Sequence, residues 1–266
     1  MRVGFIGGGN MGGGIARGLI ERGIVRPDEI VICEVVDSVR EQLRARHGFR
    51  VTVAHADALT EMDAVVLAVK PQDFSAAAKA MRGDLPQEPL LISIMAGVRI
   101  ETIVAALPTT RAVRVMPNLG ATIGESFSTW IGAAGVTESD RRLVRTLLGA
   151  VGREYEVQTE SYLDMATALA GSGPGFVLLL VEALIDGGVH IGLPRPLATE
   201  MALQTMLGAV RWAQVDGRHP AELRAQVVSP AGTTAAGVLA LERGGVRAAI
   251  VDAVVAAFER SRALGG

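Results

Sequence analysis

Residues 2–12 of the chain read RVGFIGGGNMG, an apolar run that leads into three spaced glycines. Gly7, Gly9 and Gly12 match the G-x-G-x-x-G pattern, which binds dinucleotides when it joins a strand to a helix. In that pattern the first glycine makes a tight turn and the second admits a pyrophosphate close to the backbone. The third lets the helix pack closely on the strand, and the helix N-terminus presents free amides to the phosphates. The stretch predicts a dinucleotide site.

The glycine turn opens a regular alternation of apolar runs and helical segments that continues to about residue 155. The runs show no polar alternation, as expected of parallel strands that helices cover on both faces. They predict strands at Arg2–Ile6, Ile30–Cys33, Ala64–Val69, Leu90–Ile94, Ala112–Met116, Phe127–Ile131 and Glu154–Val157. Helical spacing predicts helices at Met11–Glu21, Ser38–His47, Gln72–Met81, Ile100–Ala106 and Glu138–Leu148. This order predicts an α/β domain with a doubly wound, mainly parallel sheet.

After residue 160 the pattern changes to helices alone. We expect them at Tyr162–Ala170, Gly175–Gly187, Arg195–Val215, Pro220–Val228, Thr234–Arg243 and Val246–Leu264. The change of class predicts two domains, residues 1–158 with the sheet and residues 159–266 all helical. The helix at Gly175–Gly187 is apolar nearly all round, so it must be buried on all sides. Because the helical domain is small, we expect it to pack against a second copy in an obligate oligomer.

Composition narrows the class of protein further. Of the 266 residues 49% are hydrophobic, which suits a large aliphatic core, and the formal net charge of -2 argues against a nucleic-acid partner. The single cysteine, Cys33, excludes an internal disulfide framework and a cysteine-cluster metal site. The start of the chain is unlike a secretory signal, and the apolar stretch Phe176–Ile185 is short of a membrane span. We therefore expect a cytoplasmic protein without membrane or metal partners.

Several residues at the predicted strand ends face the same crevice. Glu34 follows the second strand, where an acidic residue usually accepts hydrogen bonds from the adenosine ribose hydroxyls. A carboxylate there also repels a 2′-phosphate, which favours NADH over NADPH. Alternatively, Glu34 is a solvated acidic residue in a loop, with no ligand. Lys70 follows another strand and either lines the cofactor groove or lies on the surface.

In the helical part, the stretch Ser229-Pro230-Ala231-Gly232-Thr233-Thr234 comes at the start of a predicted helix. Small residues followed by two threonines place backbone amides beside hydroxyl groups, which suits a substrate carboxylate. Ordinary helix capping by serine or threonine explains the same residues equally well.

Taken together, seven stretches resemble the Δ1-pyrroline-5-carboxylate reductase family. They occur in family order and span nearly the whole chain. They are GFIGGGNMG (Gly4–Gly12), LAVKPQ (Leu67–Gln72), ISIMAGV (Ile92–Val98), VRVMPN (Val113–Asn118), GSGPGF (Gly171–Phe176), EALIDGGVHIGLPR (Glu182–Arg195) and HPAELRAQVVSPAGTT (His219–Thr234).

The resemblance implies a Rossmann domain and a helical domain that forms a dimer, often assembled into decamers. It implies reduction of the imine of 1-pyrroline-5-carboxylate to L-proline, the last step of proline biosynthesis, with NADPH or NADH. The implied cofactor-binding residues are Gly7, Gly8, Gly9, Asn10, Met11, Glu34, His55, Val69, Lys70, Pro71, Ala96, Gly97 and Asn118. The implied substrate-binding residues are Ser229, Ala231, Gly232, Thr233 and Thr234, with Thr234 and Glu160 as the catalytic candidates.

The chain departs from the family pattern at a few positions. Leu119-Gly120 stand where Thr-Pro is usual, Gly175 and Ala170 replace Ala and Ser, Ala231 replaces Gly, and His55 stands where Asn is common. These departures bear on cofactor preference and on the ring size of the substrate, not on the hydride chemistry.

We consider three other functions. A β-hydroxyacid dehydrogenase needs a lysine acid in its second domain, and the absence of lysine from residues 157–266 argues against this function. A reductase of the six-membered analogue piperideine-carboxylate is compatible with the loop departures. A non-catalytic NAD(P)-sensing protein would not need the residues predicted to bind the substrate carboxylate.

Overall fold

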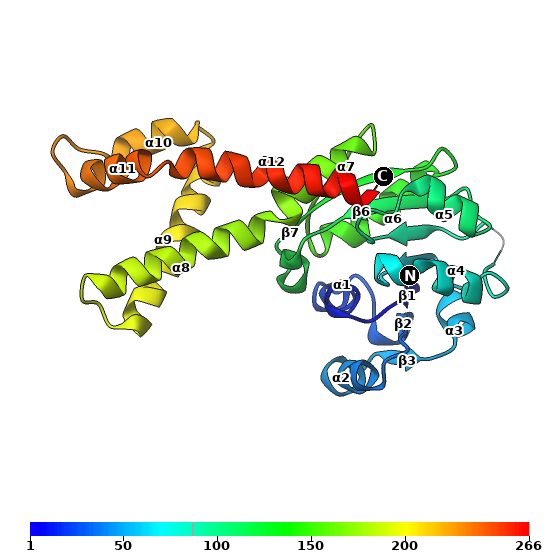
Figure 1. The fold of residues 1–266 in the computed structure, drawn as a ribbon. Coiled ribbons are helices and arrows are strands. Elements are labelled where there is room, and N and C mark those ends of the chain that lie inside the picture. Colours follow the sequence, from blue (N-terminus) through cyan, green and yellow to red (C-terminus); the bar gives the residue numbers. More distant parts are fainter. Residues whose placement is uncertain (87, 266) are drawn as a thin grey trace. The chain divides into compact units, whose positions relative to one another are not determined.

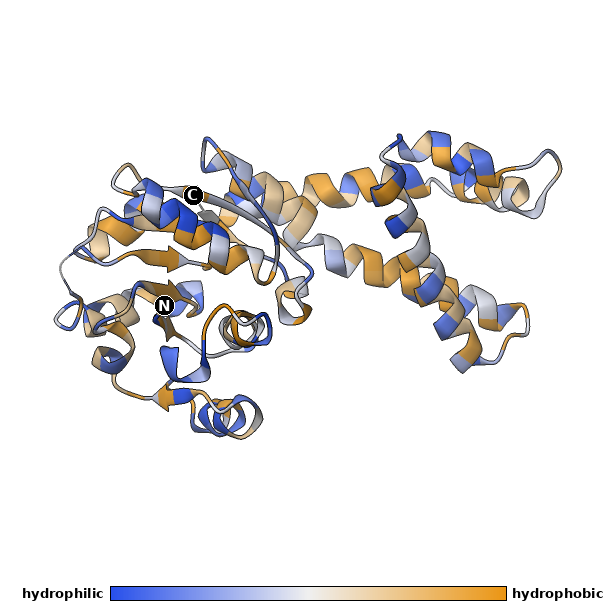
Figure 2. Cartoon of the chain, turned by 180° about the vertical axis from the view of Figure 1, so that it is seen from behind, coloured by the Kyte–Doolittle hydropathy of each residue, from blue (hydrophilic) through white to orange (hydrophobic). Residues whose placement is uncertain are grey.

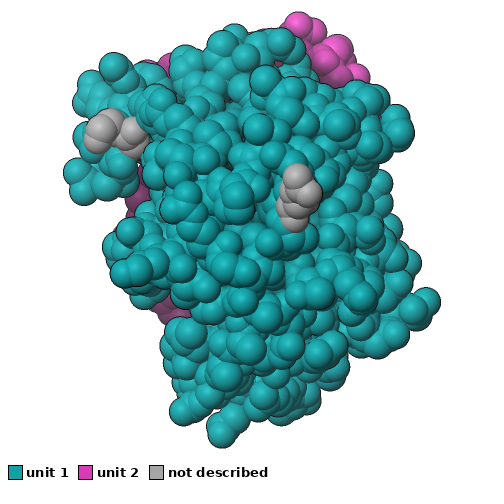
Figure 3. Space-filling model, turned by 90° about the vertical axis from the view of Figure 1, so that its right-hand side faces the viewer, with its two compact units in different colours: residues 1–172, 257–266 teal, residues 173–256 magenta. Residues whose placement is uncertain are grey.

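The computed structural model describes residues 1–86 and 88–265 of the chain. Contacts between residues divide the chain into two compact units, coloured separately in Figure 3. Unit 1 comprises residues 1–172 and 257–266, and unit 2 comprises residues 173–256. The predicted boundary after residue 158 coincides with the change from strands to helices, because β8 ends at Glu156 and α7 begins at Ser161. As a domain boundary it stays a prediction.

Unit 1 is built on one eight-stranded sheet with the order β3-β2-β1-β4-β5-β6-β7-β8 (Figure 1). Neighbouring strands are parallel except for β6 and β7. The strands are β1 Val3–Ile6, β2 Ile30–Cys33, β3 Arg50–Thr52, β4 Ala64–Leu67, β5 Leu91–Ser93, β6 Ala112–Met116, β7 Ser126–Gly132 and β8 Gly152–Glu156. Strand order reverses between β1 and β4, so the crevice that binds ligands in such sheets lies at their carboxyl ends.

Helices cover both faces of this sheet, and each face has its own core. Ile30 and Ile32 of β2 belong to the core that α1, α2 and α6 complete, whereas Val31 and Cys33 belong to the core beneath α3, α4 and α5. Burial on both faces explains why the strands read as continuous apolar runs. The helices of unit 1 are α1 Asn10–Glu21, α2 Asp37–His47, α3 His55–Leu59, α4 Phe74–Met81, α5 Ile100–Ala106, α6 Glu138–Gly149 and α7 Ser161–Ala166.

In its described residues 173–256, unit 2 consists of helices joined by short loops, with no strand. Figure 2 shows hydrophobic residues along much of its long helices, in keeping with the apolar pattern of the sequence. The helices are α8 Gly173–His190, α9 Arg195–Asp216, α10 Pro220–Val227, α11 Thr233–Arg243 and α12 Val246–Gly265, of which α12 ends within unit 1. The predicted fold class, a doubly wound sheet followed by helices, is confirmed. The short β3 and α3 are additions that the sequence did not predict.

One expectation about the helical segment is wrong. Residues 161–190 form a continuous helical stretch, with a π-helical turn at Thr167–Gly171, and its mean hydropathy reaches 1.8. By length and composition this stretch is able to cross a membrane, whereas the sequence suggested that the apolar segment is too short. One such helix is weak evidence for a membrane span, because the core helix of a soluble protein passes the same test.

Candidate active site

The glycine turn after β1 combines two tightly packed glycines with one open glycine. Gly7 has a φ of +100°, and a Cβ atom there would lie 2.7 Å from the carbonyl oxygen of Ala68. A Cβ atom on Gly12 would lie 2.4 Å from the carbonyl oxygen of Gly7, so the helix start packs directly on the turn. At Gly9 a Cβ atom would meet nothing within 4 Å. The backbone at Gly9 is therefore exposed at the N-terminus of α1, as pyrophosphate binding requires.

Glu34 lies directly after β2, and its carboxylate is fixed by the backbone. Its Oε2 accepts a hydrogen bond from the Gly8 amide at 2.8 Å, and its Oε1 accepts one from the Val36 amide at 2.8 Å. The residue is only 8% exposed. Two charge-assisted hydrogen bonds hold this carboxylate beside the glycine turn.

A cavity of about 650 Å³ joins the turn to the acidic residue. Six of the predicted cofactor residues line it, namely Gly7, Gly9, Glu34, His55, Val69 and Lys70. Gly8 and Asn10 line a neighbouring cavity of about 420 Å³. One wall of the larger cavity was not predicted: Ala76, Ala77 and Ala80 of α4. The helical spacing of these small side chains is visible in the sequence and could have predicted this wall.

Cys33 also lines this cavity, at the end of β2. Burial raises the pKa of its thiol to about 11, and the Sγ donates to the Val53 carbonyl oxygen at 3.6 Å. The thiol therefore stays protonated near neutral pH and is a poor nucleophile. Among residues 1–86 and 88–265, no group of three His, Cys, Asp or Glu side chains is placed to hold a metal ion.

The remaining predicted cofactor residues follow strands of the same sheet edge or open the first helix. Met11 lies in the first turn of α1, Pro71 begins a 3-10 helix after β4, and Ala96 and Gly97 form the turn after β5. Gly97 has a φ of +76°, which suits glycine in that turn.

Asn118 lies after β6 and ties two loops together. Its Nδ2 donates to the Ala170 carbonyl oxygen at 3.0 Å, and its Oδ1 accepts from the Gly120 amide at 3.0 Å. A Cβ atom on Gly120 would lie 2.5 Å from the Glu125 carbonyl oxygen. A proline at position 120 would lose the amide and meet this carbonyl group, so the departure from the family pattern fits the local packing.

Glu160, predicted as a catalytic candidate, lies just before α7. Its Oε1 accepts hydrogen bonds from Arg114 Nη1 at 3.0 Å and from the Ile100 amide at 3.1 Å. This carboxylate is therefore engaged by groups of the protein itself. The sequence did not single out Arg114, because a charged residue inside an apolar strand gives no sign of its partners.

The predicted substrate loop belongs to unit 2. Gly232 precedes the first turn of α11, its amide donates to the Ser229 carbonyl oxygen at 3.0 Å, and Ala231 has a φ of +59°. This φ explains why glycine is usual at position 231. Thr233 and Thr234 open α11, where backbone amides have no partner within the helix. The loop thus has the amides and hydroxyl groups that a carboxylate needs.

The sheet topology, the open glycine and the fixed acidic residue define a dinucleotide-binding protein of the Rossmann type. A family model described as "NADP oxidoreductase coenzyme F420-dependent" matches residues 2–97. A second, described as "Pyrroline-5-carboxylate reductase dimerisation", matches residues 160–264.

Similar proteins extend these matches to the whole chain. Pyrroline-5-carboxylate reductase of Methanosarcina acetivorans is 42% identical over 99% of this chain and 98% of its own length. The enzyme of Arabidopsis thaliana is 40% identical over 99% of this chain and 95% of its own. A structure of pyrroline-5-carboxylate reductase from Coxiella burnetii has a TM-score of 0.91 at 30% identity and covers 100% of this chain and 98% of its own. The Plasmodium falciparum pyrroline carboxylate reductase with NADP bound has a TM-score of 0.88 at 28% identity, with the same coverage. The chain belongs to the pyrroline-5-carboxylate reductase family, whose members are NAD(P)H-dependent oxidoreductases.

Two glycine variants separate folding from cofactor binding. Gly7→Ala forces a side chain into positive φ against the Ala68 carbonyl group, so we expect the free energy of unfolding to fall by about 2 kcal/mol or more.

In Gly9→Ala the added methyl group meets open space, so the free energy of unfolding should change by less than about 1 kcal/mol. The same methyl group would lie where the glycine pattern predicts the pyrophosphate, so the KM for NAD(P)H should rise about tenfold or more. Denaturant titration and steady-state kinetics measure the two effects. An unchanged KM in Gly9→Ala would contradict the assignment of this turn.

Proposed function

We propose that the protein reduces 1-pyrroline-5-carboxylate to L-proline with NAD(P)H, the last step of proline biosynthesis. The observation that carries this proposal is the likeness over the full chain to relatives of that name, which includes both the cofactor cavity and the substrate loop. When bound, the reduced nicotinamide supplies a hydride. In the balanced reaction the imine carbon of the ring (C2 of the pyrroline, which becomes C5 of proline) gains that hydride, the ring nitrogen gains a proton, and NAD(P)H becomes NAD(P)⁺.

Unit 1 carries the residues that would hold the dinucleotide. The adenosine part fits the cavity between Glu34 and His55, and the amides at the start of α1 fit the pyrophosphate. Because the strand order reverses between β1 and β4, the dinucleotide crosses this point and its nicotinamide lies toward the loops after β4 and β5. Val69–Pro71 and Ala96–Gly97 occupy those loops.

The chain's own groups mainly need to hold the imino acid in place. We assign the substrate carboxylate to the amides of Ala231 and Thr233, because the expected third donor, the Gly232 amide, already donates to the Ser229 carbonyl oxygen. We assign the ring nitrogen to the hydroxyl group of Thr234. A protonated cyclic imine accepts a hydride readily, so orientation contributes several kcal/mol of the rate enhancement without a strong general acid. Thr234 or a water molecule relays the proton to nitrogen.

Two alternatives differ from this proposal in substrate or in turnover. A piperideine-carboxylate reductase would use the same loops with a larger ring, and an NAD(P)-sensing protein would bind the cofactor without reducing either imine. Measuring oxidation of NADH and of NADPH with the five-membered and six-membered substrates distinguishes all three. The proposed function requires faster turnover of the five-membered imine.

We also propose NADH as the preferred cofactor. The backbone amides of Gly8 and Val36 hold both oxygens of Glu34, so this carboxylate is not free to swing away from a 2′-phosphate. Arg40, a nearby cation, pairs with Asp37 and donates to the Glu34 carbonyl oxygen. The positive charge of Arg40 is therefore partly neutralised by Asp37, which leaves less of it to attract a 2′-phosphate. The Plasmodium falciparum relative has NADP bound, so this proposal concerns the present chain and not that relative.

The unit of assembly that we propose is a homodimer formed through the helical domain. Leu178 and Leu179 on α8 are 64% and 65% exposed, and Leu203 and Leu207 on α9 are also exposed. Exposed apolar surface of this kind marks an interface. The resemblance to the family implies that five such dimers assemble into a decamer. Because NAD(P)H is an intracellular cofactor, we place the protein in the cytoplasm.

Removing the charge of Glu34 should shift cofactor use toward NADPH. In Glu34→Ser we expect the NADPH:NADH ratio of kcat/KM to rise about tenfold or more, because a like charge near the 2′-phosphate is gone. Glu34→Gln is the matched control for size, since it keeps an acceptor oxygen but no charge, and it should shift the ratio in the same direction. An unchanged ratio in both variants would show that Glu34 does not face the ribose.

Thr234→Ala should impair substrate handling far more than cofactor binding. We expect kcat/KM for the imine to fall about 10²-fold, as typical for loss of a proton-transferring group, with the Kd for NAD(P)H nearly constant. Thr234→Ser keeps the hydroxyl group and should recover most of the activity. Equal losses toward substrate and cofactor would argue against this role for the α11 start.

A charge on the apolar face of α8 should disrupt the oligomer. We expect Leu179→Glu to shift the protein toward monomer or to unfold it, because an obligate dimer often has no stable folded monomer. Thr146→Glu adds the same charge to an exposed position of α6 in unit 1 and should leave the oligomer intact. Light scattering after size exclusion, with circular dichroism, provides the measurement. A wild-type protein that is monomeric at micromolar concentration would refute the proposal.

A further inference from the structure

A buried arginine lies in the middle of the sheet, on β6. Arg114 pairs in register with Ser93 of β5 and Ile131 of β7, and its side chain is 5% exposed. A buried guanidinium group requires acceptors for its charge and its N–H groups. Two carboxylates meet it: Glu160 Oε1 lies 3.0 Å from Nη1, and Asp164 Oδ1 lies 3.6 Å from Nη2. The arginine thus connects the sheet to the segment around the start of α7.

Glu160 extends this connection to the loop between β5 and α5. The same Oε1 that meets Arg114 accepts a hydrogen bond from the Ile100 amide at 3.1 Å. Ile100 is the first residue of α5, and residues 94–99 before it form the loop that contains Gly97. A negative charge at a helix N-terminus is favourable, so the contact stabilises the end of the loop. One carboxylate oxygen therefore holds both a cation and the loop.

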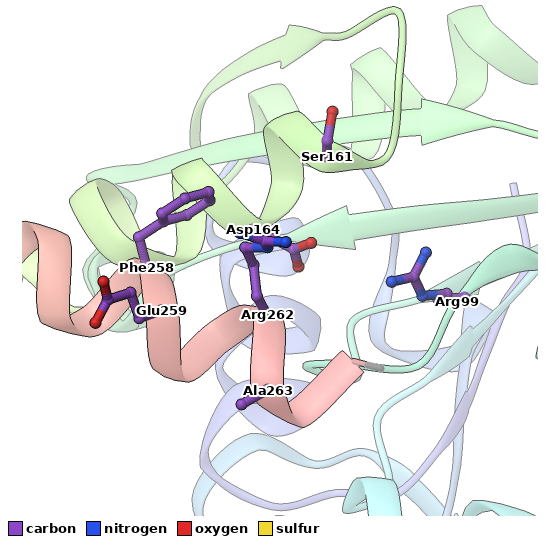
Figure 4. Close-up of a pocket in the computed structure, with 7 residues that line it drawn as sticks. All are labelled: Arg99, Ser161, Asp164, Phe258, Glu259, Arg262 and Ala263. Carbon is purple, nitrogen blue, oxygen red and sulfur yellow. The ribbon is translucent and has the colours of Figure 1, made fainter.

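Asp164 extends the network to the C-terminal helix. Its Oδ1 accepts a hydrogen bond from Ser261 Oγ of α12 at 3.4 Å. Figure 4 shows Asp164 with Arg262 of α12 and with Arg99, the residue before α5, around a cavity of about 670 Å³. The network thus joins β6, α7, α12 and the end of the β5–α5 loop within unit 1.

We propose that Glu160, held by Arg114, is a positioning residue that fixes the β5–α5 loop against the nicotinamide half of the dinucleotide. The inference rests on the proposed function, because it takes the dinucleotide to run from the Glu34 cavity past α1 toward β4 and β5. The loop after β5 lies at the far end of that path. Glu160 acts through the Ile100 amide and not on the substrate, since its Oε1 already accepts from a cation and an amide.

The decisive test compares two ligands on one variant. Glu160→Ala releases the Ile100 amide, so the Kd for NAD(P)H should rise about tenfold, and kcat for the imine should fall by a similar factor. ADP-ribose lacks the nicotinamide, so its Kd should stay within about twofold of the wild-type value. Calorimetry measures both affinities on the full chain. A parallel loss for the two ligands, or no loss for either, would overturn the proposal.

A conservative variant separates positioning from proton transfer. Glu160→Gln keeps an oxygen that accepts from the Ile100 amide, and Asp164 still faces Arg114. We therefore expect it to recover most of the NAD(P)H affinity and of kcat. If Glu160 gave a proton to the substrate, Gln would lose kcat as fully as Ala while NAD(P)H binding stayed intact, and the proposal would be wrong.

Loss of an ion pair formed just before β6 provides the matched control. Arg111 precedes β6 and lies 2.5 Å from the buried Asp140 on α6, away from the β5–α5 loop. Arg111→Met should lower thermal stability yet leave the Kd values for NAD(P)H and ADP-ribose unchanged. The binding measurements need no turnover. If they agree with expectation while the wild-type protein reduces neither imine, only the proposed function fails.

Discussion

The conformation at Gly7 is the constraint on which the cofactor site depends. Its φ of +100° turns the chain sharply after β1, and the turn packs without a gap against Ala68 at the neighbouring strand. This packing aims the N-terminus of α1 across the point where the strand order reverses. The same turn places the Gly8 amide where it fixes Glu34, so one backbone conformation sets both the proposed phosphate end and the proposed ribose end of the cavity.

The sheet and the cofactor turn were predictable because each depends on local pattern. Strands buried on both faces read as unbroken apolar runs, and β2 and β6 have the predicted bounds Ile30–Cys33 and Ala112–Met116. Gly7 and Gly12 are required by sterics, because a Cβ atom at either position would overlap backbone atoms. Helices α5 and α9 begin at the predicted residues for a similar reason, since their apolar spacing persists over the whole element.

The remaining features depend on partners that are distant in sequence. β3 has three residues, of which Arg50 is exposed, so it carries too little pattern to be recognised. The Glu160 carboxylate reads as a catalytic candidate by position alone, and only the fold brings Arg114 and Ile100 to it, 46 and 60 residues away. The sequence connects the Leu119-Gly120 departure only with cofactor preference and ring size, whereas the packing of Gly120 against the Glu125 carbonyl group gives it a local structural reason.

The substrate loop carries a backbone strain that packing must maintain. Ala231 adopts a φ of +59°, a conformation that costs a non-glycine residue about 1 kcal/mol or more. The Gly232 amide bonded to the Ser229 carbonyl oxygen closes the turn, and a Cβ atom on Gly232 would lie 2.3 Å from the Ser229 hydroxyl group. The turn is therefore set before any ligand arrives. Because the remaining amides at the start of α11 are already oriented, a carboxylate bound at this proposed site would not have to order the loop, which would reduce the entropic cost of binding.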